Sequence, residues 1–370
     1  MITISEGKLR SIDAVSNDKG VITAAAMDQR GSLQKSIAKA KGVSDKEVTP
    51  AMMSEFKTIV TKVLTPYASA ILLDPEFGLP ASKQRSKNAG LLLAYEKTGY
   101  DATGPGRIPT FLDGYSAKRL RQDGADCVKV LLYYTPFDDP KVNERKHEIM
   151  ERIGKECAEE DIAFFLEFVG YDPTPPPVSS RQTTGPIAVQ SKETGGGAKG
   201  GDAKDLAYAK LKPEIVIKSM EEFSKDKYKV DVLKVEIPID VKFLKGSKAF
   251  SGKEIAYEWD EAKAIFKRQN QCTKKPFIYL SAGVSDDIFR ESLELAISAG
   301  VNFAGVLCGR ATWKDSIPVY AQGGVKALEA WLLDRGVKNI KALNAVLDKG
   351  AKPWYARYGG RDQVKVLAHR

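Results

Sequence analysis

Eight short apolar segments recur along this chain of 370 residues. Each is rich in β-branched and aliphatic residues, which is typical of a strand that is buried on both faces. Longer segments with helical periodicity separate most of them, and this alternation is typical of repeated βα units that build a parallel sheet. The eight expected strands are Val21 to Met27, Ala70 to Asp74, Gly90 to Tyr95, Asp126 to Tyr134, Ile162 to Val169, Val230 to Ile237, Pro276 to Ala282 and Asn302 to Cys308.

Eight such units close naturally into one (β/α)8 barrel, the TIM-barrel architecture, and we predict that α/β fold as a single domain over residues 1–370. The alternative is a doubly wound open sheet, but no G-x-G-x-x-G turn follows the first expected strand. The expected helices are Thr49 to Leu64, Ser116 to Asp123, Glu144 to Glu159, Pro213 to Ser224, Asp260 to Gln269 and Asp286 to Ala299.

Two segments depart from the alternating pattern. Residues 173–211, after the fifth expected strand, are rich first in proline and then in glycine, which predicts a flexible insertion at the catalytic face. A surface insertion is the favoured role and a lid over the site is the alternative. Residues 344–370 form a basic carboxyl-terminal tail, which Trp354 and Tyr355 are expected to anchor to the barrel.

The composition excludes several classes of protein. Hydrophobic residues make up 43% and charged residues 28%, as in soluble globular proteins, and no apolar segment approaches the roughly 20 residues of a membrane span. The amino-terminal segment does not resemble a signal peptide, and four scattered cysteines predict reduced thiols in the cytoplasm. We therefore expect a cytoplasmic protein that does not bind membranes, and a homo-oligomer is usual for such an enzyme.

Charge and histidine content narrow the possible chemistry. With two histidines, the chain is not expected to hold a catalytic zinc, another metal or a Ser-His-Asp triad. The net charge of +9 fits an anionic partner, but the basic residues are spread along the chain without a nucleic-acid-binding pattern. We therefore expect a phosphorylated substrate and no nucleic acid, with lysines and carboxylates as the reactive groups.

Lys234 is the most informative single residue, because it interrupts an apolar segment that is closed by Pro238. A lysine in such a position must form an ion pair, reach solvent or lose its proton. A neutral, enclosed lysine is a nucleophile that forms a Schiff base with a carbonyl substrate. For this lysine alone, a structural ion pair with Glu236 is the simpler interpretation.

Two more charged residues interrupt neighbouring apolar strands, Lys129 in the fourth and Glu167 in the fifth. A second ammonium near Lys234 would disfavour its charged form and so activate the amine. A nearby carboxylate would transfer the protons that carbinolamine dehydration and carbon–carbon cleavage require. A buried Lys–Glu network without catalytic function is the alternative.

Polar residues also follow the first, seventh and eighth strands, whose carboxyl ends face the active site of a barrel. Asp28 is a candidate catalytic residue. Barrel enzymes commonly bind phosphate at the last two strands, and the alternative is turn glycines and a surface ion pair. The candidate substrate-binding or phosphate-binding residues are Gln29, Arg30, Ser281, Gly283, Gly309 and Arg310.

Several long segments carry a resemblance to a known family: Ala26–Gly31, Tyr67–Pro80, Gly90–Asp101, Ser116–Leu120, Val232–Glu236, Tyr279–Val284 and Gly305–Trp313. On these segments, which lie between about Lys19 and Leu343, the chain resembles the tagatose-1,6-bisphosphate aldolases, which are class I barrel aldolases. The insertion after the fifth strand and the basic tail are longer than this family leads us to expect.

The resemblance implies a (β/α)8 fold and cleavage of D-tagatose 1,6-bisphosphate to dihydroxyacetone phosphate and D-glyceraldehyde 3-phosphate, without metal or cofactor. It implies that Lys234 forms the Schiff base, that Glu167 transfers protons and that Lys129 accompanies them. Asp28 with Gln29 matches the polar end of the first strand, and Ser281 with Arg310 matches the phosphate-holding positions. Fructose 1,6-bisphosphate and 6-deoxy-6-sulfofructose 1-phosphate are alternative substrates, and a ligand-binding regulatory barrel is the alternative from another class.

Overall fold

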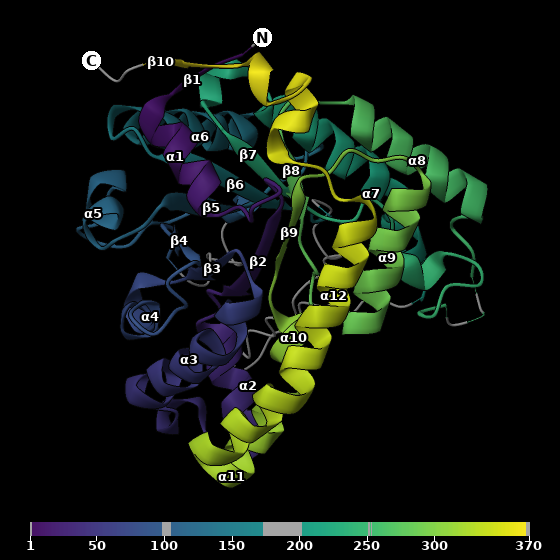
Figure 1. The fold of residues 1–370 in the computed structure, drawn as a ribbon. Helices are drawn as coiled ribbons and strands as arrows, with labels where there is room; N and C mark the ends of the chain where they lie inside the picture. Colours follow the sequence, from purple (N-terminus) through teal and green to yellow (C-terminus); the bar gives the residue numbers. More distant parts are fainter. Residues whose placement is uncertain (1, 98–104, 173–201, 251, 253, 368–370) are drawn as a thin grey trace, which may run out of the picture.

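Eight parallel strands close into a barrel in the computed structural model, which describes residues 2–97, 105–172, 202–250, 252 and 254–367 (Figure 1). The predicted barrel is therefore confirmed, and the doubly wound open sheet was the wrong alternative. In ring order the strands are β2 (Ile22–Met27), β3 (Ala70–Leu73), β4 (Gly90–Ala94), β5 (Cys127–Tyr133), β6 (Ala163–Val169), β7 (Val232–Val235), β8 (Phe277–Tyr279) and β9 (Gly305–Cys308).

Helices surround the barrel, and all six predicted helices are present within a few residues of their expected ends except at the start of two of them. They are α3 (Pro50–Leu64), α5 (Ala117–Gln122), α6 (Pro140–Glu159), α7 (Asp202–Phe223), α8 (Trp259–Gln271) and α9 (Asp286–Ser298). The pattern did not predict α2 (Gly31–Lys41) or α4 (Pro75–Ser82), which contains Pro80. The chain continues through α10 (Arg310–Trp313), α11 (Ser316–Trp331) and α12 (Val337–Gly350).

The two unusual segments have helical parts. Residues 173–201 of the predicted insertion lie outside the described residues, whereas residues 202–211 belong to α7. The predicted tail starts inside α12. Within the described part of the chain, no helix combines the length and the apolar character that crossing a membrane requires.

Helix α1 (Glu6–Ala14) closes the amino-terminal end of the barrel. Its Gly7 amide donates to the carboxylate of Asp161 at 2.9 Å, and the Lys8 ammonium lies 2.8 Å from the carboxylate of Asp231. Asp161 and Asp231 each precede a barrel strand closely, so these contacts join the helix to the strand starts. The carboxyl ends of the strands at the other end of the barrel are therefore left for a site, as in other barrels of this type.

The two ends of the chain meet at this closed end (Figure 1). Strand β1 (Ile2–Ser5) pairs in parallel with β10 (Val364–Leu367). Between α12 and β10, Trp354 is fully buried among the apolar residues of the barrel base and donates its indole N–H to Asp13 at 3.1 Å. The tail is thus held to the body by the tryptophan that the sequence analysis selected.

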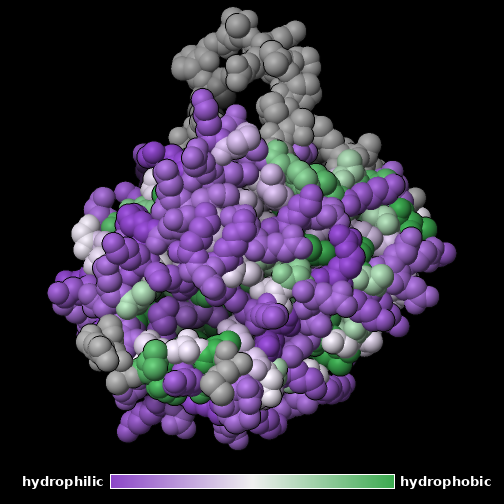
Figure 2. Space-filling model, turned by 90° about the horizontal axis from the view of Figure 1, so that it is seen from above, coloured by the Kyte–Doolittle hydropathy of each residue, from purple (hydrophilic) through white to green (hydrophobic). Residues whose placement is uncertain are grey.

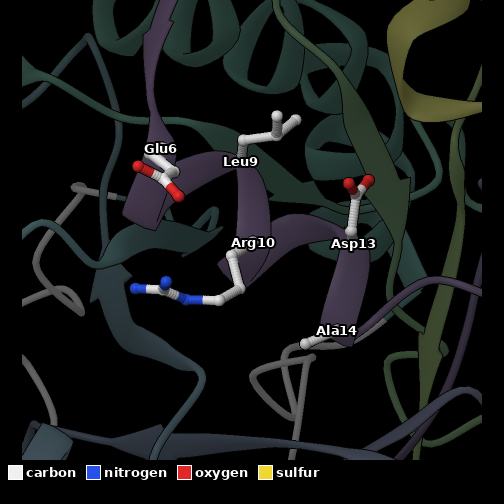
Figure 3. Close-up of a pocket in the computed structure, with 5 residues that line it drawn as sticks. All are labelled: Glu6, Leu9, Arg10, Asp13 and Ala14. Atoms are coloured by element: carbon white, nitrogen blue, oxygen red, sulfur yellow. The ribbon is translucent and has the colours of Figure 1, made fainter. Parts of the chain in front are cut away.

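Figure 2 views the molecule from the side where both chain ends lie, and this face is mostly hydrophilic with small, separate hydrophobic patches. A shallow hollow of about 440 Å³ lies along the outer face of α1 (Figure 3). It is lined by Glu6, Leu9, Arg10, Asp13 and Ala14, and it is remote from the strand carboxyl ends.

We predict that Trp354→Ala lowers the free energy of unfolding by about 3–5 kcal/mol, because it removes a large, fully buried side chain from the barrel base. Urea unfolding followed by circular dichroism measures this loss. Trp259→Ala is the matched control, since Trp259 is 36% exposed and its loss should cost much less. Equal effects of the two substitutions would contradict a role of Trp354 in anchoring the tail.

Candidate active site

Lys129 is the centre of a charged cluster inside the carboxyl-terminal half of the barrel. Its side chain is fully buried, and its Nζ lies 2.8 Å from Asp28 Oδ2, 2.9 Å from Glu96 Oε1 and 2.8 Å from Glu167 Oε2. The side chains of a strand alternate between its two faces, and those two residues apart share one. Ala26, Ala94 and Phe165 point into the barrel. Asp28, Glu96 and Glu167 each lie two residues further along the chain, so their carboxylates point inward as well.

Lys234 joins the same cluster from the next strand. Glu167 on β6 and Lys234 on β7 are register partners, and Lys234 Nζ lies 2.9 Å from Glu167 Oε2. One carboxylate oxygen thus contacts both ammonium groups. Glu236, the partner considered for a purely structural lysine, instead accepts from the Gly170 amide at 2.8 Å and lies 3.4 Å from Lys212.

The electrostatics keep Lys129 charged. Burial lowers the pKa of the Lys129 ammonium, but Asp28, Glu167 and Glu96 raise it, and the pKa lies well above its ordinary value. Burial raises the pKa of the Glu167 carboxyl, but Lys129 and Lys234 lower it below its ordinary value. The same balance lowers the pKa of Asp28. Lys129 is therefore a fixed cation between ionised carboxylates, which makes it a poor nucleophile.

Glu96 is a residue of this cluster that the sequence analysis missed. It lies two residues after the end of β4, is 3% exposed, and accepts from the Leu131 amide at 3.1 Å as well as from Lys129. The signal was available, because Glu96 lies on the inward row two residues after Ala94. It was overlooked because the Glu96–Lys97 pair reads as a solvated turn at the end of a strand.

Arg30 has a different environment from the one expected. Its buried guanidinium donates to Glu76 at 2.8 Å and to the Glu96 carbonyl at 2.7 Å. These contacts tie the loop after β2 to the ends of β3 and β4. Two of its nitrogens thus donate to internal acceptors, which gives Arg30 a positioning role, and its expected phosphate contact stays a prediction.

Lys57, on α3, is a second buried residue that the sequence analysis missed. Its ammonium is fully buried, donates to the carbonyls of Met27 at 2.6 Å and Gln29 at 2.7 Å, and forms an ion pair with Asp74. Those two carbonyls flank Asp28. A helical lysine among ordinary polar positions gives no sequence signal for such a contact, although the structure shows that it holds the backbone that presents Asp28.

The ends of β8 and β9 lie close to each other. A side chain on Gly283, whose φ is +79°, would approach the Arg310 guanidinium to 3.1 Å. A side chain on Gly309 would come within 2.9 Å of the Ala26 carbonyl and 3.3 Å of Gln29 Nε2. The two glycines therefore leave room for Arg310 and Gln29 at the barrel rim, near the buried Ser281.

A metal centre finds no support in the described part of the chain. It contains no group of three or more His, Cys, Asp or Glu side chains placed to hold an ion. The three clustered carboxylates surround Lys129 instead, so its ammonium occupies the position that a metal ion would take.

Known proteins with similar sequences identify the family of this chain. Residues 22–315, which are most of the chain, match the model of the DeoC/LacD family aldolase. The chain belongs to this family. Tagatose 1,6-diphosphate aldolase 2 of Enterococcus faecalis is 48% identical over 357 residues, with 96% of this chain and 98% of the relative covered. The tagatose 1,6-diphosphate aldolase of Listeria innocua is 45% identical over 367 residues, with 99% of each covered.

The resemblance found in the sequence is therefore confirmed. Among solved structures, a fructose-bisphosphate aldolase from Plasmodium falciparum aligns with a TM-score of 0.58 at 14% identity, covering 93% of this chain and 94% of that one. A second structure, Cgl0159 from Corynebacterium glutamicum, aligns with a TM-score of 0.51 at 13% identity and covers 91% and 90%. Because the sequence identities are this low, the structural similarity shows that this chain and the two solved structures share a fold.

We predict that Lys129→Met lowers the free energy of unfolding by about 3–5 kcal/mol at pH 7, because it leaves Asp28, Glu96 and Glu167 without their shared cation. In the native protein, the lowered pKa values of Asp28 and Glu167 add stability above the unfolded-state pKa and lose it as pH falls through the folded-state pKa. The variant has lost that contribution, and the unfolded-state pKa values lie near 4, so its deficit should be smaller at pH 3 than at pH 7.

Urea unfolding at both pH values measures the deficit. Lys155→Met is the control, because Lys155 is 73% exposed and lies 3.9 Å from Glu159 on the helix surface, where a pair contributes little. A Lys129→Met deficit that is constant or grows at acid pH would contradict the proposed electrostatic balance.

Proposed function

We propose that the chain is a class I aldolase that cleaves D-tagatose 1,6-bisphosphate to dihydroxyacetone phosphate and D-glyceraldehyde 3-phosphate through a Schiff base on Lys234. One observation carries the proposal: Glu167 Oε2 lies 2.9 Å from Lys234 Nζ and 2.8 Å from Lys129 Nζ. Inside the barrel, the proposed proton carrier Glu167 thus contacts both the proposed nucleophile Lys234 and the fixed cation Lys129. The names of the relatives support the substrate.

Schiff-base formation needs a neutral amine and two proton transfers. Glu167, whose pKa lies below its ordinary value, is ionised and accepts a proton from Lys234. Lys234 Nζ then attacks the C2 carbonyl carbon of the ketose, and the electron pair of the broken carbonyl π bond moves to oxygen. A proton passes from the attacking nitrogen to this oxygen, which gives the neutral carbinolamine with its hydroxyl. The protonated Glu167 returns its proton to this hydroxyl, which leaves as water, and the nitrogen lone pair forms the iminium bond.

Cleavage then breaks the bond between C3 and C4. A carboxylate removes the proton of the C4 hydroxyl, the C3–C4 electron pair moves towards the iminium, and D-glyceraldehyde 3-phosphate leaves as the aldehyde. We assign Asp28 or Glu167 as this base, since the pKa of each lies below its ordinary value and both carboxylates contact Lys129 Nζ. The enamine left on Lys234 takes a proton at C3, and water hydrolyses it to release dihydroxyacetone phosphate.

Lys129 has an electrostatic role in this scheme. Its ammonium is held by three carboxylates and does not give up its proton, so the nucleophile is Lys234. The same ammonium keeps Asp28 and Glu167 in their ionised forms, which are the forms that accept protons.

The rim at β8 and β9 is the proposed site for the phosphate on C1. Arg310 supplies a guanidinium, and Ser281, Gly283 and Gly309 supply a hydroxyl and backbone amides in a space that the glycines keep open. Gln29 lies beside Gly309 and is the neighbouring polar contact. Arginine and free backbone amides are preferred ligands of phosphate.

The choice of ketose and the partners of the chain complete the proposal. Tagatose and fructose bisphosphates differ at one hydroxyl, and one or two contacts set such a preference, so fructose 1,6-bisphosphate is an alternative substrate. The sulfonated 6-deoxy-6-sulfofructose 1-phosphate is a further alternative. We propose a small anionic ligand and no nucleic acid or membrane partner. Assembly as a homo-oligomer and a cytoplasmic location are predictions from the sequence.

Borohydride reduction with dihydroxyacetone phosphate, followed by peptide mass analysis, tests the mechanism. We expect one stable adduct on the peptide that contains Lys234, because the imine formed there is reduced to a secondary amine. Lys234→Met should abolish the adduct and lower kcat on the order of 10⁴-fold or more, with the fold intact by circular dichroism. An adduct on Lys129 would reverse the assignment of the two lysines, and full turnover of Lys234→Met would end the proposal.

We also expect cleavage to continue after dialysis against EDTA. The carbonyl in this mechanism is activated by the iminium nitrogen and not by a Lewis acid. Initial rates before and after EDTA treatment should agree within experimental error, with a zinc-dependent aldolase treated in parallel as the control. Loss of activity that returns on adding a divalent metal would point to a metal-dependent mechanism.

A further inference from the structure

Arg107 is a half-buried cation near the carboxyl-terminal mouth of the barrel, on the short 3-10 helix η3 (Pro105–Arg107). Its guanidinium carbon lies 4.8 Å from the centre of the Tyr133 ring and 5.2 Å from that of Tyr171. No carboxylate among the described residues pairs with it. The two rings orient the guanidinium while leaving its N–H donors to another acceptor.

Strand register places this cation just above the cluster. Leu131 is the register partner of Glu167, and Tyr133 is the partner of Val169, one inward position further along both strands. Two residues of strand span about 7 Å. Leu131 and Tyr133 are partly exposed, whereas the outward-facing Leu132 between them is buried, so the inner wall is open to solvent at this point.

Arg107 and Arg310 occupy opposite sides of the barrel mouth. Arg107 stacks on the tyrosine that ends β5, whereas Arg310 follows β9, and these two strands are four steps apart in the ring of eight. Lys234, on β7, lies midway between them. A linear ketose whose carbonyl reaches Lys234 and whose C1 phosphate reaches Arg310 therefore extends towards Arg107.

We propose that Arg107 binds the distal anionic group of the substrate, the phosphate on C6. This inference rests on the proposed function of the same site. A guanidinium forms two parallel hydrogen bonds to a phosphate, which suits recognition of a group at the end of a flexible chain. Arg107 is then a specificity-determining residue that favours bisphosphates over ketose 1-phosphates.

The surroundings of Arg107 keep it available for such a ligand. The neighbouring carboxylate of Asp138 accepts a hydrogen bond from Tyr171 and lies 3.7 Å from the fully buried Lys146 ammonium, so its charge is already balanced. Arg107 itself has a φ of +49°, which is uncommon for a residue with a side chain. Gly106 before it admits no side chain, since a Cβ there would lie 2.0 Å from Val142.

Steady-state cleavage of tagatose 1,6-bisphosphate and of tagatose 1-phosphate by Arg107→Met tests the assignment. We expect kcat/KM for the bisphosphate to fall about 10- to 100-fold, as for the loss of a charge-assisted contact, and kcat/KM for the 1-phosphate to change less than about twofold. Arg107→Lys should restore part of the bisphosphate rate. Arg145→Met, at an exposed arginine on α6, is the matched control and should leave both rates unchanged.

The two substrates separate binding from structure. Equal losses for both substrates would show that Arg107 only supports the fold, and no loss for either would show that the distal phosphate binds elsewhere; each result would overturn the inference. Failure of the proposed function has a different signature, because the unsubstituted protein would then cleave neither substrate and give no borohydride adduct. That result would remove this inference too.

Discussion

The ammonium of Lys129 is the interaction on which the rest of the site depends. It is fully buried, and it joins carboxylates that follow or lie on three different strands: Asp28 after β2, Glu96 after β4 and Glu167 on β6. A buried ammonium and a buried carboxylate are each costly alone, and they become tolerable only when each satisfies the other. One cation therefore fixes the relative positions of three strand ends in the open half of the barrel.

This arrangement also separates the roles of two chemically identical side chains. Lys129 contacts three carboxylates, whereas the contact of Lys234 within the cluster is with the single oxygen of Glu167 that Lys129 already shares. The cation with more partners stays charged and organises the carboxylates. Lys234, with fewer partners, is the lysine that we propose as the nucleophile. In our proposal, the different roles of the two lysines follow from the different carboxylates around each one.

The strands, and the charged residues that interrupt them, could be predicted from the sequence. Lys129, Glu167 and Lys234 stand out because a charged residue in a segment buried on both faces needs a special reason. Glu96 and Lys57 did not stand out, since one follows a strand beside another charge and the other lies on an amphipathic helix. The internal contacts of Arg30 could not be predicted, because its two acceptors, Glu76 and the Glu96 carbonyl, are far away in sequence. Local pattern reveals which side chains are out of place, but tertiary contacts decide which partners they meet.

The two ends of the barrel use their polar groups differently. At the closed end, two polar contacts join α1 to the starts of the strands: the ion pair of Lys8 with Asp231, and the hydrogen bond from the Gly7 amide to Asp161. At the open end, the charges near Lys129 satisfy one another, and the same holds for Asp138 with Lys146. In the part of the chain that the structure describes, Arg107 stacks on tyrosine rings and Arg310 lies beside Gly283, and in our proposal these two cations meet the anionic groups of the substrate. A ligand with an anionic group at each end therefore matches the charges that the fold itself does not consume.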